Sequence, residues 1–207
     1  MSSCKFLLLS LSILFISCSP KISNWASKES PTSFKAKFET TQGDFIVEFH
    51  REWSPLAVDR AFQLIQSGFY DSTAFHRVVK DYVAQFGISN DSTKNHFWTE
   101  LELKDEPVVK ENTEGTLSFA RGGPHTRGTQ LFINLKNNSP RLDTLNYSGV
   151  TGFPVVGKII EGAEVPGLLF SGYGNNVNQE KIQKEGYTYL SSSLPDLDYI
   201  IRARVIK

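Results

Sequence analysis

"FHRVVKDYVAQFG", residues 75–87, consists of two short extended runs joined by a polar turn. In the first run, the two-residue period of a strand places Phe75 and Arg77 on one face, with His76 and Val78 on the other. Arg77 therefore stands where a strand normally buries an apolar side chain. Judged by spacing alone, Arg77 fits a salt-bridged position on an edge strand, and His76 fits a hydrogen-bonded structural role.

Similar extended runs recur on both sides of this segment. Two alternating runs flank residues 41–44, which predicts a β-hairpin with Gly43 at the bend. Stretches rich in turn-forming residues separate the further runs, at residues 116–121, 129–135, 153–160 and 198–207. Many short strands of this kind predict a mainly β domain, either a barrel or a sandwich, and periodicity does not choose between them.

Two segments have a helical pattern. Residues 54–68 begin with Ser54 as a predicted N-cap and Pro55 at the first helical position, and they end at Gly68. Residues 161–170 predict a shorter second helix, which Pro166 interrupts. The polar residues 178–186 are helix-prone, and we expect them to form an excursion on the surface.

The composition excludes several classes of function. Of the 207 residues, 40% are hydrophobic, and 22 basic residues balance 22 acidic ones, so a nucleic-acid partner is not expected. The four histidines are not spaced as metal ligands, and the chain lacks a phosphate loop and a G-x-S-x-G elbow. The glycine-rich residues 120–130 could cradle an anion, but no amphipathic helix follows them. We expect no metal and no cofactor.

The first 18 residues predict export. A single Lys5 precedes an apolar stretch that is too short to span a bilayer, as in a secretory signal. The stretch ends in LFISC, which resembles a bacterial lipobox with Cys18 as the lipidated residue. Ordinary signal-peptide cleavage is the alternative. The chain has two cysteines, Cys4 inside the signal and Cys18 at its end, so the exported domain would contain no disulfide.

The chain divides into three predicted parts. Residues 1–18 form the lipoprotein signal, residues 19–33 a polar flexible tether, and residues 34–207 the folded domain. Lipidation at Cys18 would anchor the domain to the bacterial cell envelope, at the periplasmic face or the outer membrane. We expect the protein to be a monomer.

Three blocks in register resemble the cyclophilin family of peptidyl-prolyl cis–trans isomerases. They are FHRVVKDYVAQFG, GTLSFARGGPHTRGTQLFINL at residues 115–135, and FPVVGKIIEGAEV at residues 153–165. The resemblance runs from about Phe38 to Ile206. It implies a closed eight-stranded antiparallel β-barrel capped by two helices, with a groove that binds proline-containing polypeptides.

The resemblance also implies roles for nine side chains. Arg77 matches the family's catalytic arginine, and Gln85 would hold it in order. The remaining matches would line the groove for the proline: Tyr82, Val83, Ala120, Gln130, Phe132, Leu142 and Phe153. Strand alternation agrees with this, because Val83 and Gln85 share a face, as do Gln130 and Phe132.

Five positions depart from the common family pattern. Tyr82 replaces phenylalanine, Val83 methionine, Phe86 glycine, Arg141 tryptophan and Phe153 histidine. We expect Tyr82, Val83 and Phe86 to lie where the proline of the substrate would sit. Because Arg77 and Gln85 are intact, the resemblance implies an active isomerase that assists the folding of exported proteins. The alternative is a module or chaperone that binds proline-containing peptides without catalysis.

Overall fold

The predicted hairpin forms one wall of the structure. The computed structural model, which describes residues 24–207, shows strand β1 (Ser33–Thr40) paired antiparallel with β2 (Gly43–His50). Gly43 adopts a φ of 126°, a conformation that a side chain disfavours. The hairpin prediction is confirmed.

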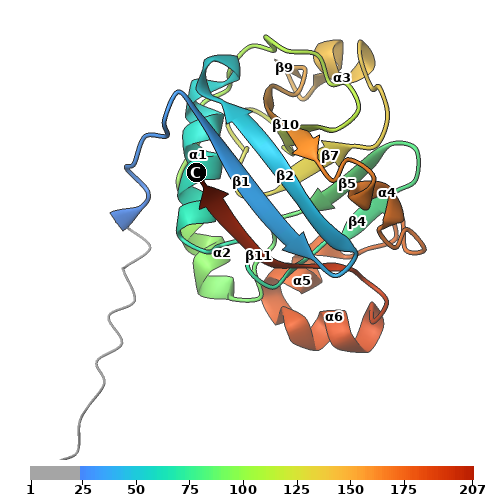
Figure 1. The fold of residues 1–207 in the computed structure, drawn as a ribbon. Coiled ribbons are helices and arrows are strands. Elements are labelled where there is room, and N and C mark those ends of the chain that lie inside the picture. Colours follow the sequence, from blue (N-terminus) through green and yellow to red (C-terminus); the bar gives the residue numbers. More distant parts are fainter. Residues whose placement is uncertain (1–23) are drawn as a thin grey trace, which may run out of the picture.

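The hairpin belongs to a nine-stranded antiparallel sheet that curls strongly on itself (Figure 1). The strand order is β3-β11-β1-β2-β10-β6-β7-β5-β4. The other strands of this sheet are β3 (Thr73–Ala74), β4 (Arg77–Val79), β5 (Val83–Phe86), β6 (Thr116–Phe119), β7 (Leu131–Asn134), β10 (Val155–Glu161) and β11 (Tyr199–Ile206). A separate two-stranded ladder joins β8 (Asn146–Tyr147) and β9 (Val150–Thr151). The mainly β prediction is confirmed.

The closed eight-stranded barrel is a wrong expectation. The sheet has nine strands and forms a half-barrel, because no ladder of hydrogen bonds joins its two edges, β3 and β4. Phe75 and His76 join these two edge strands along the chain. The Phe75 N–H donates to the Asp198 carbonyl at 2.9 Å, and pairing with β5 begins only at Arg77. The expected continuous strand is therefore broken at His76.

Aromatic rings fill the inside of the curled sheet. Phe38 stacks on Phe45 across the hairpin, with ring centroids 5.0 Å apart. Phe86 meets Phe38 and Tyr70 edge-on at 6.0 and 5.3 Å. All four rings are buried. Burial of one such side chain stabilises a fold by about 1.5–3 kcal/mol, so this core holds the sheet in its curled form. The candidate site lies on the outer face of the same sheet.

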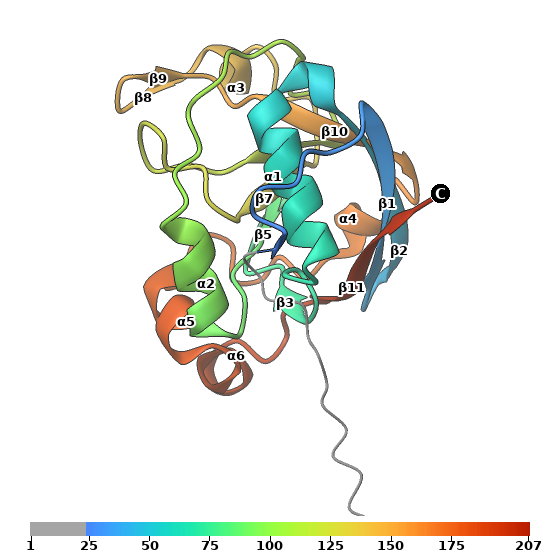
Figure 2. The ribbon, with the colours of Figure 1, turned by 90° about the vertical axis from the view of Figure 1, so that its left-hand side faces the viewer.

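Helices surround the sheet, six instead of the two expected, in the part of the chain that the structure describes. Two of them match the predicted segments at residues 54–68 and 161–170. The helices are α1 (Pro55–Gln66), α2 (Ser92–Thr99), α3 (Arg141–Thr144), α4 (Val165–Leu168), α5 (Gln179–Glu185) and α6 (Tyr187–Ser193). A 3₁₀ turn, Arg51–Trp53, precedes α1. Figure 2 shows α2, α5 and α6 together at one end of the domain.

A distant carboxylate, and not the side chain of Ser54, caps α1. Ser54 occupies the predicted N-cap position but donates its hydroxyl to Glu106 at 2.5 Å. The Glu106 carboxylate accepts from the N–H groups of Leu56 and Ala57 at 2.8 and 3.1 Å. A negative charge here is also favoured by the helix dipole.

A second, smaller core lies under α5 and α6. Ile182 and Leu190 of these helices pack with Ala74 of β3 and with Ile88, just after β5. The segment that carries α5 and α6 is thereby packed against Ala74 and Ile88, which lie before and after Arg77 in the sequence.

The first described residues run along α1 (Figure 2). Trp25 and Ala26 pack against the main core, and Ser30 donates its N–H and its hydroxyl to Asp59, each at 2.9 Å. The prediction of a flexible tether is therefore corrected for residues 24–33, which are attached to the domain because Asp59 and the core give them partners. Cys18 and the predicted signal lie outside the described residues. Within residues 24–207, no helix has both the length and the apolar character of a membrane span.

Candidate active site

Strand pairing brings the catalytic candidates together. Gln85 of β5 lies opposite Arg77 of β4 on one side and opposite Phe132 of β7 on the other. Directly opposed residues of antiparallel strands project their side chains to the same face. Arg77, Gln85 and Phe132 therefore share the outer face of the sheet, away from the aromatic core.

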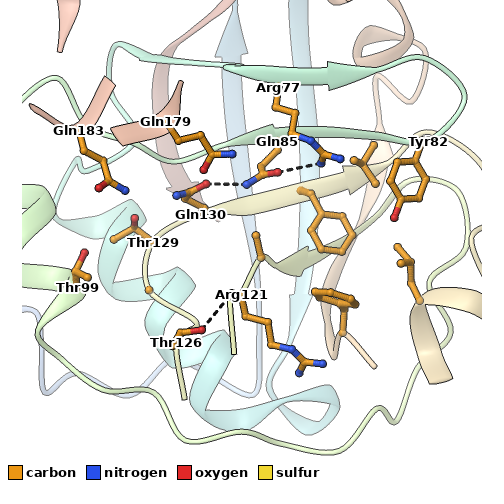
Figure 3. A pocket seen from close by; sticks show the side chains of 17 residues that line it. Arg77, Tyr82, Gln85, Thr99, Arg121, Thr126, Thr129, Gln130, Gln179 and Gln183 are labelled. Carbon is orange, nitrogen blue, oxygen red and sulfur yellow. Dashed lines mark hydrogen bonds between the residues drawn. The ribbon is translucent and has the colours of Figure 1, made fainter. Parts of the chain in front are cut away.

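A chain of amide groups holds the guanidinium of Arg77 (Figure 3). Arg77 Nη1 donates to Gln85 Oε1 at 3.1 Å, and Gln85 Nε2 donates to Gln130 Oε1 at 2.7 Å. Arg77 Nε donates to Asn175 Oδ1 at 2.8 Å. No carboxylate of the described residues lies within 4.0 Å of this guanidinium, so the salt bridge suggested by spacing alone is not formed. β4 is nevertheless an edge strand, as that interpretation required.

The electrostatic setting of Arg77 follows from its partial burial. Burial lowers the pKa of Arg77 from its usual value, and the neighbouring Tyr82 acts in the opposite direction. Arginine nevertheless remains charged at neutral pH. Because its partners are neutral amides, the positive charge of Arg77 is not cancelled by an adjacent acid.

An apolar pocket opens beside the guanidinium. Val83, Phe132 and Leu142 are buried and form a cluster separate from the main core, and Phe153 packs edge-on against Phe132 with ring centroids 5.6 Å apart. The cavity has a volume of about 500 Å³. All nine predicted catalytic and groove residues line it: Arg77, Tyr82, Val83, Gln85, Ala120, Gln130, Phe132, Leu142 and Phe153. Their individual roles stay predictions.

Tyr82 forms the lip of the pocket between two cations. The guanidinium carbon of Arg77 lies 6.0 Å from the centre of the Tyr82 ring, and that of Arg141 lies 5.4 Å from it. Both distances fall in the range of cation–π attraction. The Tyr82 and Arg141 departures from the family pattern are therefore next to each other and interact.

Phe86 does not belong to the pocket, which corrects the expectation that it lies beside the proline. Its side chain is fully buried and faces the aromatic core, because strand alternation turns it away from its neighbour Gln85. The glycine that follows it is constrained: Gly87 has a φ of 106°, and a Cβ there would lie 2.4 Å from the Thr129 carbonyl oxygen.

His76 is unsuited to act as a base at neutral pH. Burial lowers the pKa of His76 to about 4, partly offset by the adjacent Gln130 side chain. Neither ring nitrogen makes a hydrogen bond of ordinary geometry with the residues that the structure describes. His76 therefore has a structural role, as predicted, but this role is the packing of its buried ring between β3 and β4. The hydrogen bonds that we expected for His76 are not formed.

Several residues of the site carried no recognisable signal in the sequence. Asn175 lies 98 positions from Arg77, in a loop rich in glycine and asparagine. Arg121, in the glycine-rich stretch, lies under the pocket with its guanidinium carbon 4.7 Å from the centre of the Phe153 ring. The rest of the cavity lining comes from Thr99, Gly122, Thr126, Gly128, Thr129, Gln179 and Gln183.

Comparison with known proteins gives the same family as the resemblance of the three motif blocks. The family model described as "Cyclophilin type peptidyl-prolyl cis-trans isomerase/CLD" matches residues 35–182. Peptidyl-prolyl cis-trans isomerase CYP18-2 of Arabidopsis thaliana is 31% identical over 144 residues, which cover 68% of this chain and 83% of that protein. Peptidyl-prolyl cis-trans isomerase B of Escherichia coli is 31% identical over 133 residues, which cover 62% of this chain and 79% of that protein.

Other relatives are much longer. Peptidyl-prolyl cis-trans isomerase CYP65 of Arabidopsis thaliana is 34% identical over 125 residues, which cover 58% of this chain and only 20% of that protein. The matched region spans about the same small share, 22%, of peptidyl-prolyl cis-trans isomerase 9 of Schizosaccharomyces pombe.

Solved structures share the fold. A crystal structure of a cyclophilin-type isomerase from Cryptosporidium parvum has a TM-score of 0.55 at 22% identity and covers 84% of this chain and 98% of its own. A second crystal structure of that protein, in the presence of the dipeptide Ala-Pro, has a TM-score of 0.54 at 21% identity, covering 84% and 99%.

Proposed function

Because the chain belongs to the cyclophilin-type peptidyl-prolyl cis–trans isomerase family, we propose that it accelerates the cis–trans rotation of X-Pro peptide bonds. One observation carries the proposal. The Arg77 guanidinium is held by neutral amide oxygens beside an apolar pocket of Val83, Phe132 and Leu142. Rotation breaks no covalent bond, so this arrangement needs no nucleophile, metal or cofactor.

The barrier explains why a hydrogen-bond donor is sufficient. Twisting a peptide bond costs about 18–20 kcal/mol because amide resonance is lost. At the top of the barrier the prolyl nitrogen regains a lone pair, which can accept a hydrogen bond that the planar amide nitrogen accepts poorly. A donor placed there stabilises the transition state more than either ground state, and only such differential binding raises the rate.

Arg77 is suited to this role by its geometry. Its Nε and Nη1 atoms are committed to Asn175 and Gln85, whereas Nη2 donates to none of the residues that the structure describes. Both N–H groups of Nη2 and the second N–H of Nη1 thus remain as donors, and we assign the contact with the substrate to Nη2. A lysine would offer no planar group that amides could hold in this way.

The pocket supplies orientation. A proline ring held among Val83, Phe132, Leu142 and Phe153 would be fixed while the preceding carbonyl group turns. Small apolar sites with a few polar groups at the rim bind rings of this kind.

Tyr82 and Val83 support a second candidate function, a binding module that holds proline-containing segments without useful catalysis. Both line the pocket, and both differ from the common family residues. Arg141 over the Tyr82 ring makes the rim of the pocket more basic than a tryptophan would.

The location of the protein is a further proposal. The signal-like N-terminus and LFISC support export and lipidation at Cys18, which would place the isomerase at the bacterial envelope, where it would assist the folding of exported proteins. Since Trp25 is packed on the domain, residues 19–24 alone would link the lipid to it, a reach of at most about 22 Å. Mass spectrometry of the mature N-terminus should find a diacylglyceryl group on Cys18. A plain cleaved terminus would refute the anchor.

Exchange spectroscopy tests the catalytic proposal. The protein is added in substoichiometric amount to an Ala-Pro-containing peptide, and exchange between the cis and trans signals is followed by NMR. We expect exchange on the sub-second timescale, against tens to hundreds of seconds without catalyst. Binding without faster exchange would favour the module instead.

A further inference from the structure

Asn175 holds the guanidinium of Arg77 at a different nitrogen from the one that Gln85 holds. Its Oδ1 accepts from Arg77 Nε at 2.8 Å, a shorter hydrogen bond than the 3.1 Å bond from Nη1 to Gln85. A hydrogen bond at a single nitrogen leaves a planar group able to swing about it. Hydrogen bonds at two different nitrogens fix both the plane and the direction of the guanidinium, and hence the direction of Nη2.

The loop that carries Asn175 is built to keep it in place. Before it, Phe170 donates its N–H to Asp198 at 2.7 Å, and the Tyr173 hydroxyl donates to Asp196 at 2.9 Å. Gly174, with a φ of 51°, makes the turn that precedes Asn175. After it, the Asn178 side chain accepts from the N–H of Lys181 at the start of α5.

The second core also holds the loop that carries Asn175. Tyr173 and Val177 pack on a cluster that includes Ile182 and Leu190 of α5 and α6. Asn175 is exposed itself, but pinned residues lie on both sides of it. Its position is therefore set by the loop and does not depend on the substrate.

Two amide acceptors, and no acid, surround Arg77 in the described residues. An asparagine at position 175 accepts the Nε hydrogen bond without neutralising the guanidinium, so Nη2 remains a charged donor. Charged donors form stronger hydrogen bonds than neutral ones.

We propose that Asn175 is a positioning residue for the isomerase reaction, which orients Arg77 so that Nη2 faces the prolyl nitrogen in the twisted state. The proposal rests on the proposed isomerase function. Loss of this contact should affect the transition state and leave ground-state binding of the peptide almost unchanged, because Asn175 lies outside the apolar pocket that holds the ring.

The test compares Asn175→Ala with Asn176→Ala in the full chain. Asn176 is the adjacent exposed residue, and its side chain makes no hydrogen bond with the described residues, so it is a matched control. NMR line shapes of an Ala-Pro peptide give the exchange rate on the enzyme and the affinity together. Asn175→Ala should lower kcat/KM about fivefold, equivalent to about 1 kcal/mol, and change the affinity less than about twofold. Asn176→Ala should match wild type in both.

Two further measurements separate positioning from a general structural effect. In an Arg77→Lys background, which lacks the Nε donor, Asn175→Ala should cause no additional loss. The Nε–Hε signal of Arg77, assigned by its disappearance in Arg77→Lys, should shift and exchange faster with water in Asn175→Ala only.

The outcomes distinguish failure of the proposed function from failure of the positioning role of Asn175. If wild type does not accelerate exchange, the proposed function fails and Asn175 has no reaction to assist. If wild type is active but Asn175→Ala keeps its full kcat/KM, or loses as much in the Arg77→Lys background, the positioning role is refuted.

Discussion

Replacing Gln85 with glutamate should separate stability from catalysis. The amide of Gln85 both accepts from Arg77 at 3.1 Å and donates to Gln130 at 2.7 Å. A carboxylate keeps the acceptor for Arg77 but places a full negative charge beside the guanidinium. It cannot donate to Gln130, whose own amide can rotate and donate in its place.

The expected changes in stability and in rate follow from the new ion pair and from the weakened donor, respectively. Two unit charges about 4 Å apart attract by about 4 kcal/mol at an effective dielectric constant of 20, and the cost of removing the new charge from water offsets most of this gain. The free energy of unfolding should therefore stay within about 1 kcal/mol of wild type. A hydrogen bond from a charged donor is worth about 1.5–3 kcal/mol and one from a neutral donor about 0.5–1.5 kcal/mol. Arg77 stays charged beside an acid, but the carboxylate offsets much of its positive potential at the prolyl nitrogen. A loss of about 1–1.5 kcal/mol, the difference between the two ranges, should lower kcat/KM about tenfold.

The assay combines peptide exchange with urea unfolding for Gln85→Glu and Gln85→Ala. The alanine variant leaves buried partners without a hydrogen bond, so it should lose both activity and about 1–3 kcal/mol of stability. The glutamate variant should lose activity alone, and should regain it relative to wild type as the introduced carboxylate is protonated below about pH 4. Wild-type kcat/KM in Gln85→Glu at pH 7 would refute the claim that the reaction uses an unpaired guanidinium.

Three other substitutions have distinct expected outcomes. Gly87→Ala should lower the free energy of unfolding by at least about 2 kcal/mol, measured in urea, because its Cβ would lie 2.4 Å from the Thr129 carbonyl oxygen at a positive φ; unchanged stability would contradict this. Arg121→Met should weaken peptide binding about fivefold by removing the cation under Phe153, with little change in kcat, and an equal loss in kcat would argue against it. His76 has a folded pKa of about 4 against 6.5 when exposed, so the unfolded state binds its proton first as the pH falls. Wild type should lose up to about 3 kcal/mol of stability between pH 7 and pH 4 through this group, and His76→Gln should show a correspondingly smaller loss.

The resemblance of three motif blocks to the cyclophilin family, with which strand alternation agrees, named nine residues that the structure brings together around one cavity. Val83 and Gln85 do share a face, and so do Gln130 and Phe132, because the two-residue period of a strand depends on local backbone geometry alone. The hairpin at Gly43 and the position of α1 are equally local properties. These are the features that the sequence predicted correctly.

One error is local: strand alternation alone turns Phe86 away from Gln85 and from the pocket. The other errors concern contacts between residues far apart in the sequence. The strand is broken at His76 because the Phe75 N–H donates a hydrogen bond to the carbonyl of Asp198, more than a hundred positions away. The alternation expected through residues 74–79 therefore stops there. Glu106 takes over the capping of α1 from a distance of 50 residues. Asn175 reaches Arg77 from a loop with no periodicity. Each contact depends on how separate segments pack, and a pattern within one segment cannot report it.

The most direct test of the catalytic account is the exchange rate of an enzyme-bound Ala-Pro peptide in wild type and Arg77→Ala, measured with the affinity in the same NMR titration. The account predicts that wild type accelerates exchange, and that Arg77→Ala loses about 10- to 100-fold of the acceleration while peptide affinity changes little, as expected for loss of a charged donor. Equal exchange rates in the two proteins at equal affinity would contradict it.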